Sequence, residues 1–194
     1  MDDTSMGFQD PTKRFLKYLR KHPDLRSRIR APVGESVAYV GSFDSEPAFL
    51  RLLRLQLTDS KTNNFFMLPD VLRRIPAPAD LFAAVGLVAP PPIRTFLDYV
   101  NFLTGEGGWA KQVPWSPDGF TIWRALSGIF VSNASGRLRL LVGDALNRGE
   151  KVFFKTEVFV LERNPDIDLF SRTAIQTIRS QMKAGVLVGK VAIV

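Results

Sequence analysis

Residues 121–143, TIWRALSGIFVSNASGRLRLLVG, place a helix pattern directly before a strand pattern. From Ile122 onward the apolar residues recur at i, i+3, i+4, i+7 and i+8, which is the spacing of the buried stripe of an amphipathic helix. Trp123 and Ser127 lie four residues apart on the flank of that stripe. RLRLLVG, residues 137–143, then has the continuous apolar centre of a buried strand. The segment predicts a helix followed by a strand.

Helix and strand patterns continue to alternate on both sides of this segment. Such an alternation favours an α/β fold, with a small, mostly parallel sheet flanked by helices and a helical N-terminal part. Gly185 is expected to end the last helix. Strands are predicted at 36–41 and 152–161, helices at 44–57 and 169–185, and a final strand or apolar tail at 186–194.

The basic charge of the chain is concentrated near its N-terminus. The net charge is +7, and residues 13–30 hold eight Lys or Arg and one acid, so the remainder is neutral. We therefore expect a basic arm over 1–30 and a single domain over 31–194, with a Pro- and Gly-rich connection at about 76–119. Within this connection IRTFLDYVNFL, residues 93–103, has a helical period. Because the domain itself is not basic, nucleic-acid binding by the whole fold is not expected.

Several kinds of chemistry are excluded by composition. The chain has no cysteine, so it has no disulfides and no thiolate nucleophile. Its one histidine, His22, excludes a histidine-rich metal site and argues against a Ser-His-Asp triad. No signal peptide or membrane-spanning segment is expected, which fits a cytoplasmic protein or a secreted one without disulfides. Catalysis would have to use carboxylates, hydroxyls, aromatic rings and arginines.

Glu157 is the most unusual carboxylate, because it lies in the apolar run VFFKTEVFVL. An acid that is buried there without a partner would cost several kcal/mol. In one interpretation the strand is half-buried, and Lys155 and Glu157 lie two residues apart on its wet face. In the other, Glu157 lies at the mouth of a pocket and acts on a ligand. Trp123 has the same two interpretations, as a residue at the edge of the core or as a ligand platform.

The order and spacing of four residues resemble the ADP-ribosyl cyclase family, which includes NAD glycohydrolases. The family pattern is a Trp, three residues and a Ser, then a helix and a hydrophobic strand, then an aromatic residue, three residues and the catalytic Glu. Trp123, Ser127, Phe153 and Glu157 fall on these positions. The resemblance covers residues 36–75 and 121–160.

The upstream part of the resemblance is carried by SVAYVGSF and FFMLPDVL. Pro69 stands where the family has the acid that balances cyclisation against hydrolysis, with Asp70 beside it, and this favours plain hydrolysis. The second active-site Trp of the family is absent, and Val40 to Phe43 occupy its region. A compact chain without cysteine is similar to the bacterial toxin domains of the superfamily more than to the animal ectoenzymes.

The resemblance implies an enzyme that cleaves the nicotinamide–ribose bond of NAD or NADP and releases ADP-ribose and nicotinamide. NAD is the substrate, and no cofactor or metal is implied. As in the toxin domains, a secreted effector and a cognate immunity protein are expected. Glu157 would be the catalytic carboxylate, and the substrate-binding positions would be Trp123, Ser127, Phe153, Asp70 and Arg124.

Two other functions compete with this hypothesis. The first is a nucleic-acid or membrane-surface binding module that uses the basic segment 13–30. The second is an interaction domain in which Trp123 and Glu157 are only framework. If Trp123, Ser127 and Glu157 surround one site, the enzyme hypothesis gains support.

Overall fold

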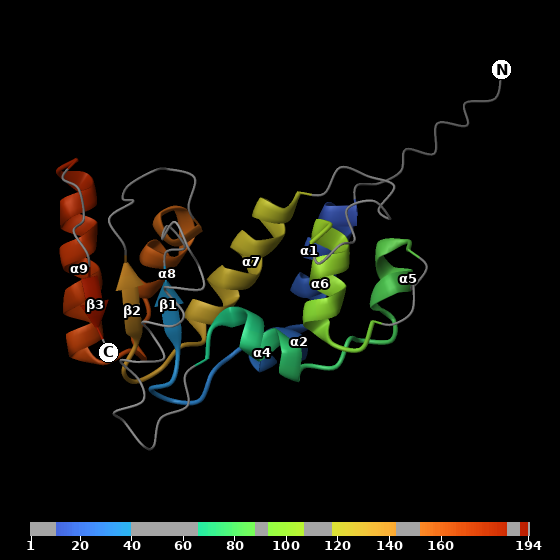
Figure 1. Cartoon of the computed structure of the whole chain (residues 1–194), viewed down its shortest axis with the longest axis horizontal. Helices are drawn as coiled ribbons and strands as arrows, with labels where there is room; N and C mark the ends of the chain where they lie inside the picture. Colours follow the sequence, from blue (N-terminus) through green and yellow to red (C-terminus); the bar gives the residue numbers. More distant parts are fainter. Residues whose placement is uncertain are drawn as a thin grey trace. The chain divides into compact units, whose positions relative to one another are not determined.

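The computed structural model describes residues 11–39, 66–87, 93–106, 118–142, 152–185 and 191–193 (Figure 1). The helix predicted at 44–57 lies outside the described residues. The chain forms two compact units. Unit 1 is Met1–Arg28 with Leu72–Ile122, and unit 2 is Ile29–Val71 with Trp123–Val194. This division differs from the predicted arm 1–30 and single domain 31–194, because the first 28 residues belong to unit 1 together with a later segment.

Unit 1 is built around a cluster of aromatic rings. Helix α1 (Pro11–Lys21) is followed by α2 (Pro23–Arg28), and α1 contacts α5 (Leu81–Val85). Phe15 of α1 is fully buried, with its ring centroid 6.1 Å from that of Phe96 and 5.9 Å from that of Tyr99. Phe82 meets Tyr99 edge-on at 4.7 Å. The basic N-terminal segment therefore supplies part of a core as well as surface charge.

The Pro- and Gly-rich stretch 76–119 contains two helices of unit 1, one at the predicted helical pattern of 93–103 and one in the part predicted to be irregular connection. They are α5 and α6 (Phe96–Thr104). Thr95 and Asp98 form a capping box at the start of α6, because each side chain accepts a hydrogen bond from the other residue's backbone N–H. Gly105, with φ of 72°, takes the left-handed conformation that ends the helix.

Unit 2 contains a small mixed sheet of three described strands in the order β1-β2-β3 (Figure 1). Strand β1 (Val37–Tyr39) pairs in parallel with β2 (Arg139–Val142), with Val37 opposite Arg139. Strand β3 (Val191–Ile193) runs antiparallel to β2. The coarse prediction of helices with a small sheet is confirmed, but only one of the two described strand pairs is parallel.

The helices on either side of β2 lie where the periodicity predicts them. Helix α7 (Gly119–Ser132) precedes β2, and α9 (Leu169–Lys183) begins where Asp168 accepts a hydrogen bond from the Ser171 amide at 2.7 Å. The buried Ser171 hydroxyl accepts a hydrogen bond from the Leu138 amide at 2.9 Å and so fastens α9 to the chain entering β2. Gly185, with φ of 66°, follows the last turn as expected.

Residues 152–161 are helical, so the predicted strand is wrong. A π-helical turn, η2 (Phe153–Glu157), continues directly into α8 (Val158–Glu162). Helix α8 contacts α9, and η2 contacts β1. Burial of one helical face against these elements outweighs the strand-like composition of the segment. The buried residues follow the helical spacing i, i+1, i+4, i+5 and i+8, being Phe153, Phe154, Glu157, Val158 and Leu161.

Helix α4 (Leu68–Arg74) follows a bridge between Phe66 and Ser36, so the chain changes from extended to helical near Pro69. The boundary between the two units falls within this helix, between Val71 and Leu72. Asp70, in the first turn of α4, accepts a hydrogen bond from the Met67 amide at 3.2 Å. This contact stabilises the start of the helix, where backbone N–H groups lack intrahelical partners.

Candidate functional site

A buried serine–glutamate pair joins two helices of unit 2. The Ser127 hydroxyl on α7 donates a hydrogen bond to Oε1 of Glu157, at the end of η2. Only 7% of Ser127 and 8% of Glu157 is exposed. The interpretation in which Glu157 shares a wet face with Lys155 is wrong, because Lys155 is exposed and Glu157 is buried. Two of the predicted site residues, 30 positions apart in the sequence, are therefore in direct contact.

Burial changes the protonation of this glutamate. Desolvation raises the pKa of Glu157 from the usual 4.5 to about 7, and the hydrogen bond from Ser127 acts in the opposite direction. Its second carboxyl oxygen, Oε2, is buried and has no hydrogen-bond partner among the described residues. A buried oxygen without a hydrogen-bond partner lowers the stability of the protein. It could accept a hydrogen bond from a ligand hydroxyl, or contact a ligand cation, if the residues that cover it moved. The group is thus a carboxyl that titrates near neutrality and has one unused acceptor.

The backbone under Glu157 is also unusual. Residues Phe153–Glu157 form a π-helical turn, which is rare, occurs mostly as a single turn within an α-helix and is frequent at functional sites. Thr156, within this turn and next to Glu157, fastens the turn to α7. Its hydroxyl accepts a hydrogen bond from Nε of Arg124 at 2.6 Å. At Gly128 a Cβ atom would lie 3.3 Å from the Thr156 methyl group, so α7 approaches the turn closely at this residue.

The sequence alone does not single out Thr156 as the residue that ties the turn under Glu157 to α7. The sequence feature that could have indicated this contact is Gly128, because a glycine inside a helix pattern costs stability and often marks a close approach to another element. Arg124, a predicted substrate-binding residue, is exposed, and its guanidinium donates the hydrogen bond to Thr156.

Two of the other predicted site residues lie on the elements that carry the pair. Trp123 is half-buried on α7, one turn before Ser127, a separation of about 6 Å along the helix axis. Phe153 lies one turn before Glu157, is 2% exposed and meets Phe154 edge-on at 5.2 Å. Asp70 lies on another element, α4, and accepts a hydrogen bond that caps that helix.

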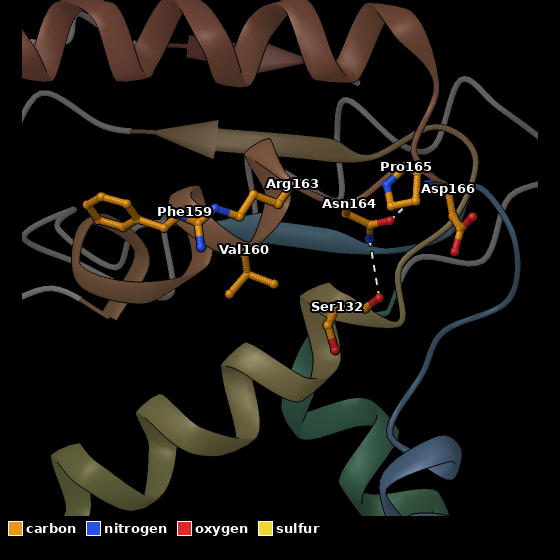
Figure 2. A pocket seen from close by; sticks show the side chains of 7 residues that line it. All are labelled: Ser132, Phe159, Val160, Arg163, Asn164, Pro165 and Asp166. Atoms are coloured by element: carbon orange, nitrogen blue, oxygen red, sulfur yellow. Dashed lines mark hydrogen bonds between the residues drawn. The ribbon is translucent and has the colours of Figure 1, made fainter.

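A cavity of about 340 Å³ opens at the C-terminal ends of α7 and α8 (Figure 2). Asn164 is one of the residues that line the cavity. Its side-chain amide nitrogen donates hydrogen bonds to the carbonyl oxygens of Val131, Ser132 and Ala134 at 2.9, 3.4 and 2.9 Å. Phe159 and Val160 supply apolar surface. None of the predicted site residues lines this cavity. Its lining is Ser132, Phe159, Val160, Arg163, Asn164, Pro165 and Asp166.

The described part of the chain offers no alternative site based on a metal ion. It contains no group of three or more His, Cys, Asp or Glu side chains that could hold one. Among the same residues, no helix is both long enough and apolar enough to cross a lipid bilayer.

No family model, curated protein or solved structure matches the chain. The likeness to the ADP-ribosyl cyclase family therefore rests on the sequence motifs in 36–75 and 121–160, among them Trp123, Ser127, Phe153 and Glu157.

Proposed function

We propose that the chain is an NAD glycohydrolase in which Glu157 is the catalytic carboxylate. The observation that carries the proposal is the buried Ser127–Glu157 hydrogen bond on a π-helical turn, with Oε2 unpartnered among the described residues. A structural glutamate on an apolar helix face would be expected to have both oxygens paired.

The chemistry needs one preorganised carboxylate. The bond between the ribose C1′ and the nicotinamide nitrogen breaks with its electron pair going to nicotinamide, which leaves as a neutral molecule. An oxocarbenium-like ribosyl cation develops, as in glycoside hydrolysis, and the oxygen of a water molecule then bonds to C1′ and loses a proton. Oε2 of Glu157 would accept a hydrogen bond from a ribose hydroxyl. The negative charge of the carboxylate would attract the ribosyl cation most strongly at the transition state.

The surrounding residues would take supporting roles. Ser127 holds Oε1, so that Oε2 faces the ribose, and Phe153 walls the pocket. Trp123 offers an indole face to the pyridinium cation, an interaction worth about 1–2 kcal/mol when desolvated. Because Glu157 is 8% exposed, NAD can reach it only if the residues that cover it move. NADP as substrate, Asp70 as a nicotinamide contact, secretion as an effector and a cognate immunity protein follow from the family resemblance.

The proposal is tested by turnover of a fluorescent NAD analogue and by chromatography of released nicotinamide. Glu157→Gln is expected to lower kcat by about 100-fold or more. Glu162→Gln is the matched control, because Glu162 lies on α8 and forms an ion pair with Arg179 at 3.2 Å outside the pair. For the wild type, kcat/KM is expected to rise with pH through about 7, as Glu157 ionises. No turnover by the wild type, or equal turnover by both variants, would reject the proposal.

A further inference from the structure

Four cations form one straight row on the surface of α1. Lys13, Lys17, Arg20 and Lys21 are all exposed and are spaced at i, i+4, i+7 and i+8. At 3.6 residues per turn these positions fall within about 100° of the helix circumference. The row, which we call the α1 cation stripe, is about 12 Å long at 1.5 Å per residue.

The orientation of the stripe is fixed by the opposite face of the helix. Phe15, Tyr18 and Leu19 are 0%, 5% and 3% exposed and belong to the core of unit 1. The Tyr18 hydroxyl also donates a hydrogen bond to Asp80 at 2.8 Å. Because this face is anchored, the stripe points away from the unit 1 core.

The stripe serves the stability of α1 only in part, because Arg20 and Lys21 lie in its last turn, where cations are favourable, whereas other features of the stripe are unfavourable. Lys13–Lys17 and Lys17–Lys21 are like-charge pairs four residues apart, which destabilise a helix. The first turn of α1 contains no acid, and Lys13 lies close to the positive end of the helix dipole. No hydrogen bond or ion pair joins the four stripe side chains to other residues in the described part of the chain. Like charges gathered on one exposed helix face, with no partner among the described residues, favour an external anion as the partner.

We propose that the α1 cation stripe binds the phosphate backbone of a nucleic acid without reading its sequence. Measured along the axis of a duplex, one strand carries a negative charge about every 3.4 Å, so a row about 12 Å long spans the axial rise of three or four phosphates. Neutralising four phosphates releases their counterions and makes the affinity steeply dependent on salt. The interaction is confined to one helix face, which agrees with the neutral charge of the chain outside 13–30.

An anionic membrane is the other polyanion to consider. Amphipathic helices that bind membranes insert their apolar face between the lipids. The apolar face of α1 is committed to Phe96 and Tyr99 through Phe15, so it cannot insert while unit 1 is folded.

The experiment uses the full chain, because removing α1 would also remove core residues of unit 1. A stripe variant carries Lys13→Gln, Lys17→Gln and Lys21→Gln. A matched control carries Arg94→Gln, Arg163→Gln and Lys183→Gln, which removes the same charge from exposed positions elsewhere. Binding to a fluorescein-labelled 20-base-pair duplex is measured by anisotropy between 50 and 200 mM salt, and binding to anionic phosphatidylserine vesicles is measured by sedimentation.

The wild type is expected to bind the duplex about 150-fold more weakly at 200 mM than at 50 mM salt, for four phosphate contacts. The stripe variant should lower the salt slope by about 2.7 and weaken binding at 50 mM at least tenfold or so, whereas the control should retain the wild-type slope. Absence of duplex binding at 50 mM overturns the proposal. Equal losses in both variants, or stripe-dependent binding to vesicles but not to the duplex, also overturn it. The NAD assay is separate, so either proposal can fail alone.

Discussion

At the scale of single residues, Glu157 is in an unfavourable environment. A carboxyl group that is almost completely buried, with one oxygen unpartnered among the described residues, costs stability whenever it is ionised. Ser127 offsets part of this cost through its hydrogen bond. Carboxyl groups with strongly perturbed pKa values cluster at functional sites, and structural networks also produce them. The pH dependence of folding provides an independent measurement of this environment.

Glu157→Gln is expected to raise stability more at pH 8 than at pH 5. The folded-state pKa of about 7 lies above the usual 4.5, so between these values the unfolded chain ionises while the folded protein retains its proton. The contribution of Glu157 to stability therefore falls as pH rises through this window, by about 3 kcal/mol in total. Urea unfolding of both proteins should show the difference between them growing by roughly that amount.

The same titration in Glu162→Gln provides the control. Glu162 is paired with Arg179, and no such growth is expected for this variant. A constant difference between Glu157→Gln and wild type across this pH range would show that Glu157 titrates normally in the folded protein.

At the scale of elements, unit 2 depends on how η2 and α8 are fixed to α7. Three contacts follow one another along the two helices. Arg124 binds Thr156, Ser127 binds Glu157, and Asn164 caps the end of α7. The successive contacts show that the two helices run in the same direction. The position of the Ser127–Glu157 pair is therefore set from both ends.

Asn164→Asp is expected to destabilise unit 2 by about 2 kcal/mol or more, because the carboxylate keeps the shape of the amide but cannot donate to three carbonyl oxygens. Asn164 is 5% exposed, so water cannot replace these bonds easily. Asn101→Asp, at a half-buried position of α6, is the matched control and should cost less than about 1 kcal/mol. Urea unfolding measures both, and equal losses would show that Asn164 is not a capping residue.

At the scale of the whole molecule, each unit draws its core from distant parts of the chain. In unit 1 the ring of Phe15 packs with those of Phe96 and Tyr99, about 80 residues later. In unit 2, Ser36 bridges to Phe66, and β1 pairs with β2 about 100 residues later. A core deletion should therefore affect segments that are far apart in sequence but belong to the same unit.

Phe15→Ala is expected to destabilise unit 1 by about 3–5 kcal/mol, and Ile175→Ala to destabilise unit 2 by about 2–5 kcal/mol. Both side chains are completely buried. Hydrogen exchange with mass spectrometry should show that Phe15→Ala loses protection in 11–28 and 93–106, whereas Ile175→Ala loses it in 123–142 and 168–183. If Phe15→Ala left 93–106 protected, the assignment of the N-terminal helices to unit 1 would be wrong.

The sequence by itself determined the features that depend on near neighbours. The periodicity of 121–132 and 169–185 predicted α7 and α9 correctly, because a helix stripe is defined by residues three and four apart. Composition determined the absence of cysteine chemistry and the basic character of 13–30. The likeness of four residues to the ADP-ribosyl cyclase family also singled out Ser127 and Glu157, but it did not predict that their side chains are in contact.

Only the tertiary structure decided which partners these segments meet. Residues 153–162 have a strand-like composition, yet they are helical because one face is buried against other elements. The same burial brought Glu157 to Ser127 and raised the pKa of its carboxyl group. In unit 1, the burial of Phe15, Tyr18 and Leu19 makes α1 a core helix and leaves its cations on the exposed face. Burial depends on contacts between distant residues, and for this reason local patterns could not supply it.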